Sequence, residues 1–342
     1  MRAEIIKSIT DNQVTIISGS TGCGKTTQVP AMVLDELILQ NKGASVNMIV
    51  TQPRRISAIG VAERIAAERC EKVGGTVGYS IRLDNKKSNK TRLLLCTTGI
   101  LLRRLQCDPD LSSVSHVFVD ETHQRDLDTD FLLIIMRDLL KRRPSMKLIL
   151  MSATLNASTF SSYFWNAPVI EIPGRTFPVE EYKLQDVLEI TGYKIMEGSD
   201  YAKKSSSLFL SKSVVKKLYP KYSKTVHDAL MIVDESVINY ELIAQLVNHI
   251  ATTHDEGAIL IFVPGLMEIT KTIDELKKYD LFTDSSRSII YPLHSTLSTN
   301  EQTAVFNVPP KGIRKIVVST DIAETSVTIE GRSLKYIVNI ST

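Results

Sequence analysis

The chain has 342 residues, which is long enough for two domains because a single hydrophobic core stops growing at roughly 250 to 300 residues. Hydrophobic residues make up 43% and charged residues 23%, proportions typical of folded globular proteins, so large-scale disorder is excluded. The formal net charge of +3 is too small to indicate a nucleic-acid partner by itself, and such a partner would have to be inferred from local clusters.

The four cysteines show neither CxxC spacing nor a nearby histidine at zinc spacing. The sequence therefore indicates neither a metal–thiolate site nor a disulfide framework. No run approaches the roughly 18 apolar residues of a membrane span. We expect an intracellular protein, cytoplasmic or nuclear, that does not cross a membrane.

From about residue 14 to 172, short β-branched runs alternate with helical stretches. This alternation is typical of βαβ units and of a parallel sheet covered on both faces. Ligands of that architecture bind at the carboxyl ends of strands, where the polar motifs of this half are found. Strands are expected at 14–18, 46–52, 92–98, 116–121 and 147–154, and helices at 28–40, 56–69, 100–106 and 130–141.

The segment "GSTGCGKTTQ" follows the apolar run "VTIIS" and matches the phosphate-binding pattern G-x-x-x-x-G-K-S/T. Its glycines let successive backbone N–H groups point into one concavity at a helix N-terminus, where an anion is favoured. We expect Lys25 to reach the β and γ phosphates of a bound nucleotide and the Thr26 hydroxyl to bind Mg²⁺. The predicted nucleotide-binding residues of this loop are Gly19, Ser20, Thr21, Gly22, Cys23, Gly24, Lys25, Thr26 and Thr27.

The segment "HVFVDETHQRD" delivers two acids, Asp120 and Glu121, at the carboxyl end of an apolar strand. A metal-binding carboxylate and a neighbour that polarises water are expected at such a position. Taken alone, the two acids could instead begin a helix, whose N-terminus favours negative charge. Beside the phosphate loop, they predict a Mg²⁺ site made by Thr26, Asp120 and Glu121.

Prolines and a glycine in "EIPGRTFPVEEYKL" indicate a joint between two domains, 1–173 and 174–342. Residues 196–232 contain seven lysines and many serines, and we expect an insertion there. A solvated surface loop is favoured over an arm that binds nucleic acid or a partner protein, because short basic stretches are weakly specific. The βα alternation then resumes, with strands expected at 257–265, 288–295, 315–321 and 335–341 and helices at 266–278 and 300–306.

The order of the motifs is similar to that of superfamily 2 helicases. It runs "GSTGCGKT", "TQPRR", "TTGILLRRL", "DETH", "SAT", "LIFVPG" and "STDIAETSVTI". From about Ile5 to Ile340, the chain resembles the DEAH/RHA family of ATP-dependent RNA helicases. The resemblance implies an α/β fold of two RecA-like P-loop domains with mostly parallel sheets. It also implies ATP-driven translocation along RNA or unwinding of RNA.

By that resemblance, Arg54, Arg55 and Thr97 of the first domain would hold the backbone of single-stranded RNA, as would Thr320 of the second. Arginine forks and hydroxyls that follow strand ends suit phosphate oxygens. For the arginine pair alone, an ordinary solvated loop is an equally good interpretation.

The resemblance also assigns residues to hydrolysis and coupling. The catalytic residues would be Lys25, Asp120, Glu121 and His123. Ser152 and Thr154 of "SAT" resemble an element that contacts the "DETH" box, and His123 would link the nucleotide site to the second domain.

Arg64 and Phe306 match the pair that sandwiches the nucleobase in the family, an arrangement that tolerates any base. Without the family, Phe306 could equally be helix-face core. Thr328 and Glu330 would face the ribose and the transferring phosphoryl group.

The chain departs from the family at several positions. Asp321 and Asn339 stand where asparagine and aspartate are usual, and Glu330 replaces an aspartate. An acid beside an RNA phosphate is repulsive by about 1 kcal/mol at 4 Å even in bulk water. The chain stops at Thr342, before the family's arginine-finger motif, so we expect a truncated second domain with impaired turnover, since such an arginine contributes roughly 10³ to 10⁵ in rate.

Two other function classes stay open. One is a nucleotide-gated RNA-binding or scaffold protein without efficient catalysis, and a protein activator is possible. The other is a P-loop enzyme of another class, such as a nucleotide kinase, which would need an acceptor-binding lid in place of "TQPRR" and "SAT". DNA instead of RNA also stays open, because phosphate contacts barely distinguish the two.

Overall fold

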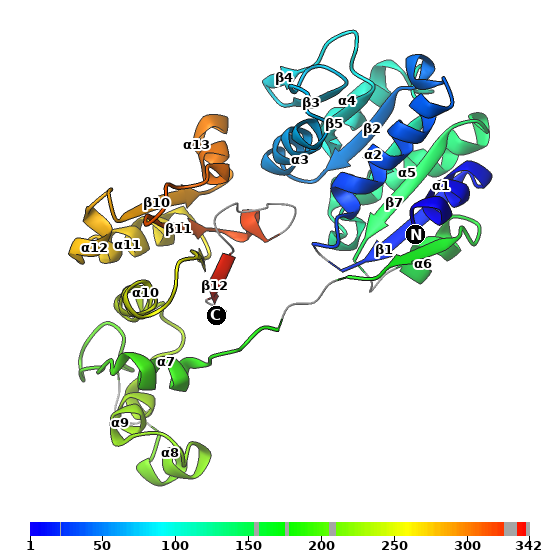
Figure 1. The fold of residues 1–342 in the computed structure, drawn as a ribbon. Helices are drawn as coiled ribbons and strands as arrows, with labels where there is room; N and C mark the ends of the chain where they lie inside the picture. The colour runs from blue at the N-terminus through cyan, green and yellow to red at the C-terminus, as the bar shows by residue number, and fades with distance from the viewer. Residues whose placement is uncertain (21, 154–156, 175–177, 205–209, 325–333, 340–342) are drawn as a thin grey trace. The chain divides into compact units, whose positions relative to one another are not determined.

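The computed structural model describes residues 1–20, 22–153, 157–174, 178–204, 210–324 and 334–339 (Figure 1). The chain divides into two compact units. The first is Met1–Phe177, and the second is Pro178–Ala323 together with strand β12 (Leu334–Asn339). The break between them falls in the Pro- and Gly-rich segment that the sequence marks as a joint.

The first unit is built on an eight-stranded sheet in the order β4-β3-β5-β2-β6-β7-β1-β8. Neighbouring strands are parallel except for β3 and β4, which form an antiparallel hairpin at the sheet edge. The strands are β1 (Val14–Gly19), β2 (Met48–Gln52), β3 (Val77–Ile81), β4 (Asp84–Lys86), β5 (Leu93–Thr97), β6 (His116–Val119), β7 (Lys147–Ser152) and β8 (Val169–Ile172).

Six α-helices lie in the described part of this unit. They are α1 (Arg2–Asp11), α2 (Lys25–Leu39), α3 (Arg55–Glu68), α4 (Thr98–Cys107), α5 (Leu127–Arg142) and α6 (Ala157–Tyr163). Helices α1 to α3 pack on one face of the sheet and α4 to α6 on the other. Among the described residues, no helix is long and apolar enough to cross a membrane.

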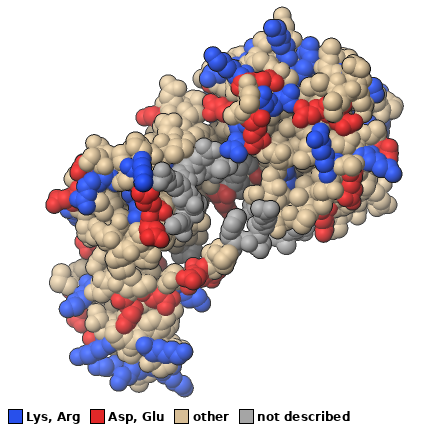
Figure 2. Space-filling view, viewed as in Figure 1, with Lys and Arg blue, Asp and Glu red and all other residues tan. Residues whose placement is uncertain are grey.

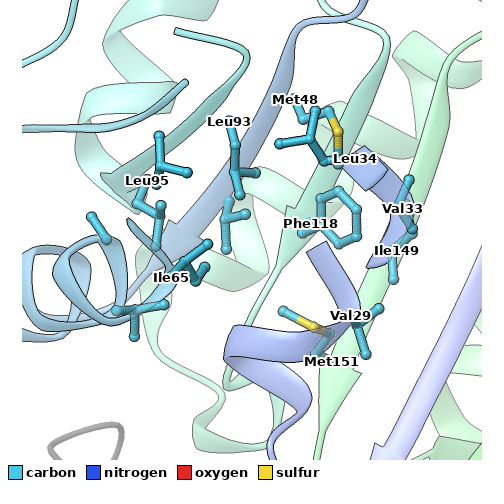
Figure 3. Packing of buried hydrophobic residues seen from close by; sticks show 14 of the residues in the cluster. Val29, Val33, Leu34, Met48, Ile65, Leu93, Leu95, Phe118, Ile149 and Met151 are labelled. Carbon is cyan, nitrogen blue, oxygen red and sulfur yellow. The ribbon is translucent and has the colours of Figure 1, made fainter. Parts of the chain in front are cut away.

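Side-chain alternation along the strands divides the core of the first unit between these two faces. Phe118 packs with α2 residues in one cluster, shown in Figure 3, whereas its neighbours Val117 and Val119 belong to the other. Ile149 of β7 lies on the same face as Phe118. Because both faces are covered, the central strands are mostly apolar and buried, which is typical of parallel sheets.

Local capping explains why two helices begin earlier than predicted. Helix α2 begins directly after Gly24, whose positive φ of 86° ends the phosphate loop. Helix α5 begins at Leu127 because the Asp126 side chain accepts a hydrogen bond from the Thr129 N–H at 2.9 Å. Such an N-cap satisfies a donor that the first turn leaves unpaired.

The second unit contains a four-stranded parallel sheet in the order β10-β11-β9-β12. Its other strands are β9 (Ala258–Phe262), β10 (Ser288–Leu293) and β11 (Arg314–Ser319). The accompanying helices are α10 (Tyr240–Thr253), α11 (Leu266–Leu276), α12 (Asp280–Thr283) and α13 (Thr299–Thr303). Two α/β units with mostly parallel sheets confirm the predicted fold class.

A helical subdomain precedes that sheet in the second unit. It consists of α7 (Leu184–Thr191), α8 (Lys212–Leu218) and α9 (Lys224–Ile232), which share a hydrophobic cluster. The prediction of a surface loop across 196–232 is therefore wrong for both lysine-bearing helices. Val215, Val226 and Leu230 are buried and anchor them, but helices this short show too little periodicity to be found in the sequence.

Candidate nucleotide site at the carboxyl edge of the first sheet

The polar motifs of the first unit lie at one edge of its sheet. Strands β1, β2, β5, β6 and β7 are all parallel, so their carboxyl ends meet there. Gln52 is paired with Thr97, and Ser18 is paired with Ser152. The phosphate loop, "TQPRR", "TTG", "DETH" and "SAT" each follow one of these five strands, so the register brings together motifs that are far apart in the sequence.

The phosphate loop requires glycine at specific positions. Gly22 and Gly24 have positive φ angles of 78° and 86°, which side chains rarely adopt. A Cβ on Gly19 would lie 2.9 Å from both the Cys23 Sγ and the Ile172 carbonyl oxygen. Thr21, predicted as part of this loop, lies outside the described residues.

Lys25 is held by the carbonyl groups of its own loop. Its side chain is 7% exposed, and Nζ donates hydrogen bonds to the carbonyl oxygens of Gly19 at 2.7 Å and Ser20 at 3.0 Å. These hydrogen bonds offset the free-energy cost of burying a charged ammonium group. Phosphate oxygens are stronger acceptors than carbonyls, so Lys25 is positioned to exchange partners when a phosphate enters.

Asp120 is the acceptor at the centre of the site. It is 2% exposed and accepts hydrogen bonds from the Thr26 hydroxyl at 2.6 Å, the Gln52 amide at 2.7 Å and the Glu121 N–H at 2.9 Å. Burial, followed by the charge of Glu121, raises the pKa of Asp120 to about 6, and these hydrogen bonds oppose that rise. The structure therefore brings together Thr26 and Asp120, as predicted, and adds Gln52.

The donor set of this site fits Mg²⁺. Hydroxyl and carboxylate oxygens are the ligands that this ion prefers, and a buried carboxylate with a raised pKa is stabilised by a cation. No group of three or more His, Cys, Asp or Glu side chains in the described ranges could hold a metal ion. Mg²⁺ commonly binds through one or two carboxylates together with substrate phosphates, so a small protein ligand set is expected.

Glu121 is linked to the end of β7 through His123. The His123 Nδ1 accepts a hydrogen bond from the Ala153 N–H at 3.2 Å, so a neutral ring carries its proton on Nε2. That nitrogen lies 3.3 Å from the Glu121 Oε2. Glu121 itself adopts a left-handed φ of 56°, an uncommon conformation for a residue with a side chain.

The contact between "DETH" and "SAT" is thus made by the backbone of Ala153, a residue that the sequence did not single out. The neighbouring Ser152 hydroxyl donates to the Ala153 carbonyl at 2.9 Å. A second link joins the Thr122 hydroxyl to the Met151 carbonyl at 3.2 Å. Thr154, the other predicted coupling residue, lies outside the described residues.

The predicted RNA-contacting residues of the first unit also lie along this edge. Arg54 precedes the first turn of α3, which begins at Arg55, and Thr97 precedes the first turn of α4. All three are half-buried. Two adjacent helix N-termini therefore meet where the β2 and β5 ends pair, an arrangement that favours anions.

Arg64 is linked to the helix that follows the phosphate loop. Its Nε donates to the Glu68 Oε1 at 2.7 Å, and the Gln28 amide of α2 donates to the Glu68 Oε2 at 2.8 Å. The Arg64 side chain is 52% exposed. The Gln28–Glu68 bridge was not predicted, because it depends on how α2 packs against α3.

The remaining predicted residues belong to the second unit. Phe306 ends a short 3₁₀ turn, Ala304–Phe306, that continues α13, and it is half-buried. Thr320 follows β11 and is buried, with its N–H donating to the Leu293 carbonyl at 3.3 Å. Asp321 is exposed at the start of the next turn. Thr328 and Glu330 lie outside the described residues.

Comparison with known protein families matches both parts of the chain. Residues 1–162 match the model described as DEAD/DEAH box helicase, and residues 240–342 match the helicase conserved C-terminal domain. The first match contains the phosphate loop and the "DETH" box. The second contains the four-stranded sheet.

Similar proteins include several named as helicases. The chain is 47% identical to the DExH-box ATP-dependent RNA helicase DExH1 of Arabidopsis thaliana over 345 residues, which cover 96% of this chain and 35% of the relative. It is 44% identical to the human putative ATP-dependent RNA helicase DHX57, covering 96% of this chain and 27% of that protein. It is also 44% identical to the human ATP-dependent DNA/RNA helicase DHX36, covering 96% and 35%. The chain thus spans about a third of the length of these relatives.

Proposed function

Because the chain belongs to the DEAD/DEAH-box helicases of superfamily 2, we propose that it binds ATP and Mg²⁺ at the edge of the first sheet and couples ATP hydrolysis to movement along RNA or to strand separation. The observation that carries this proposal is the convergence of Lys25 with the Thr26–Asp120 pair at one helix N-terminus. A cation donor, a hydroxyl and a buried carboxylate are the groups that a Mg²⁺–triphosphate needs.

In this proposal, each group at the site has one task. Lys25 leaves the two loop carbonyls and binds the β and γ phosphates. The oxygens of Thr26 and Asp120 would hold Mg²⁺, and the ion would supply positive charge to neutralise the phosphates. Gln52 keeps the Asp120 carboxylate oriented through its 2.7 Å bond. Glu121 polarises the attacking water as general base.

The link from Glu121 through His123 to Ala153 would couple the nucleotide site to the "SAT" motif, which begins at Ser152, the last residue of β7, and ends at Thr154. The distances of 3.3 and 3.2 Å along this link support a direct connection. A change at the γ phosphate would reach the end of β7 through these two contacts.

RNA would bind through its phosphates at Arg54, Arg55 and Thr97, with Thr320 adding a contact from the second domain. Backbone contacts of this kind position a strand without reading its sequence. We therefore expect little sequence preference.

The nucleobase would be held by stacking. Residues of the second domain would contact the ribose and the transferring phosphoryl group of the nucleotide. Stacking on an aromatic face accepts any base, so several nucleoside triphosphates should bind. The residues proposed for these contacts are Arg64, Phe306, Thr328 and Glu330. As functional domains we propose residues 1–173 and 174–342, with a boundary four residues before the division of the two compact units at Phe177.

Phosphate release from ATP, measured with and without single-stranded oligouridylate, tests this proposal. We expect hydrolysis to rise with RNA in the wild-type chain and to be abolished in Lys25→Ala. Nucleotide binding without hydrolysis above the Lys25→Ala background would refute the enzymatic proposal. If RNA affinity still responded to ATP in that case, a nucleotide-gated RNA-binding protein would replace it.

A further inference from the structure

Positive charge is concentrated in one short segment of the second unit. Residues 201–227 contain seven lysines and no arginine, aspartate or glutamate. Since the whole chain has a formal net charge of +3 and this segment contributes +7, the rest of the chain carries −4. The basic character of the protein therefore comes from this segment.

Five of these lysines are carried by a folded scaffold. Helices α8 and α9 are capped by the Ser211 and Ser223 hydroxyls, which accept hydrogen bonds from the N–H groups three residues later. The Tyr222 hydroxyl donates to Asp186 of α7 at 2.5 Å. Buried Val215 fixes the inner side of α8. The lysines are consequently presented in a defined arrangement instead of on a free tail.

The outer side of this scaffold is a basic surface. Figure 2 shows Lys and Arg side chains gathered over the end of the second unit where α8 lies. The basic surface comprises the exposed residues Lys212, Lys216, Lys217, Lys221 and Lys224.

Nearby carboxylates do not neutralise the basic surface by ion pairing. None of its five lysines joins an ion pair within the described ranges. On α7, Asp186 accepts from the Tyr222 hydroxyl and the Lys183 N–H, while Glu189 accepts from the Ser223 N–H at 3.0 Å. Both acids are thus directed to uncharged donors, and the five ammonium groups are left to face solvent.

We propose that the basic surface is a second RNA contact, separate from the nucleotide-binding unit. This inference rests on the proposed function, in which the chain binds RNA. Helix α8 has 7 residues and rises about 10 Å along its axis, a length over which a nucleic-acid strand presents several phosphates. Lysine contacts to phosphates are sequence-independent, as a translocating protein requires.

Two apolar side chains make single-stranded RNA the better match within nucleic acids. Val214 and Leu218 of α8 are 44% and 61% exposed beside the lysines. Unpaired bases offer apolar faces that can cover such side chains, whereas a duplex presents mainly phosphates. The combination of ammonium groups with exposed apolar groups therefore fits an unpaired strand.

The test compares RNA affinity across salt concentrations for the full chain and for a variant with three neutralised lysines. Binding of fluorescent single-stranded oligouridylate is followed by anisotropy between about 50 and 200 mM salt. Each lost phosphate contact should lower the slope of log K against log salt by about 0.7, so a loss of about 2 is expected. The variant carries Lys212→Gln, Lys216→Gln and Lys217→Gln.

Two control variants isolate the effect of this surface. Replacing the same three lysines by arginine keeps the charge and should keep both affinity and slope. Neutralising three exposed lysines of the first unit should leave the slope unchanged, although it alters the net charge equally. That second control carries Lys42→Gln, Lys72→Gln and Lys90→Gln.

The outcomes separate this inference from the proposed function. If the wild-type chain binds RNA and the α8 variant matches it in affinity and slope, the second contact is refuted. The basic surface would then be solvated or bind an acidic protein. If the wild-type chain binds ATP but no RNA, the proposed function fails, and this inference fails with it. ATP affinity should be equal in all variants.

Discussion

Replacing His123 by alanine should separate ATP binding from RNA-stimulated hydrolysis. The ring connects two elements, through Nδ1 to the Ala153 N–H and through Nε2 to Glu121. Alanine removes both contacts and leaves the phosphate loop and Asp120 with all their hydrogen bonds. ATP affinity should therefore change by less than about twofold, because the residues proposed to bind ATP before hydrolysis keep their contacts.

The expected size of the effect follows from the two contacts. Both distances, 3.2 and 3.3 Å, are longer than the usual optimum for a hydrogen bond, so each contact should contribute a free energy near the lower end of the range for its type. A neutral hydrogen bond contributes about 0.5 kcal/mol and one to a carboxylate about 1.5 kcal/mol. The sum of about 2 kcal/mol corresponds to a loss of roughly 30-fold in the RNA-stimulated rate.

The assay combines ATP titration with hydrolysis rates in the presence and absence of RNA. A double-mutant cycle with Glu121→Gln adds a specific control, because two residues that share one contact give non-additive effects. Asp128→Ala, an exposed change on the next helix, should have no effect. Additive losses in the cycle, or an affinity loss as large as the rate loss, would refute this account of the link.

Other changes test the phosphate loop, the core and a half-buried histidine. Gly19→Ala places a Cβ 2.9 Å from the Cys23 Sγ and the Ile172 carbonyl oxygen, so the loop must move to accommodate it. Overpacking of this kind costs about 1 to 3 kcal/mol, so ATP affinity measured by fluorescence titration should fall by at least about tenfold. Unchanged affinity would contradict the loop geometry. Phe118→Ala should lower the free energy of unfolding in urea by about 3 to 5 kcal/mol, because Phe118 is fully buried, and a loss below about 1 kcal/mol would argue against this packing. Burial lowers the pKa of His116 from 6.5 to about 4, so its contribution to stability is complete above pH 6.5 and is lost as the pH falls towards 4. Between neutral pH and about pH 5, the wild type should lose about 2 kcal/mol more than His116→Gln in urea unfolding, and identical losses would exclude this role.

The first sheet was largely predictable because its strands are buried on both faces. Apolar runs bounded by polar motifs identify such strands, and the parallel arrangement then places the strand ends together. This reasoning predicted that Thr26 and Asp120 lie together, and the structure places them in hydrogen-bond contact. Their roles at a nucleotide site stay a prediction. The hairpin β3–β4 was not found, since its three-residue partner strand at the sheet edge has no apolar pattern.

The residues that support the site depend on register and packing, which single segments do not encode. Gln52 reaches Asp120 because β2 pairs with β6, with Thr51 beside Val119. Ala153 acts through its backbone N–H, so its side chain gives no signal. The helical subdomain was missed for a similar reason, because its cluster includes Leu188 of α7, which is distant in the sequence from both basic helices.

The bonds from Lys25 to its own loop affect which anions can compete with the nucleotide. An incoming ligand competes for this ammonium group with the two loop carbonyls that already accept hydrogen bonds from it. Inorganic phosphate makes few additional contacts that could compensate for the loss of these lysine–carbonyl hydrogen bonds. A di- or triphosphate also accepts hydrogen bonds from successive backbone N–H groups of the loop. The free protein should therefore discriminate by the length of the phosphate chain, and cellular orthophosphate should be a poor competitor.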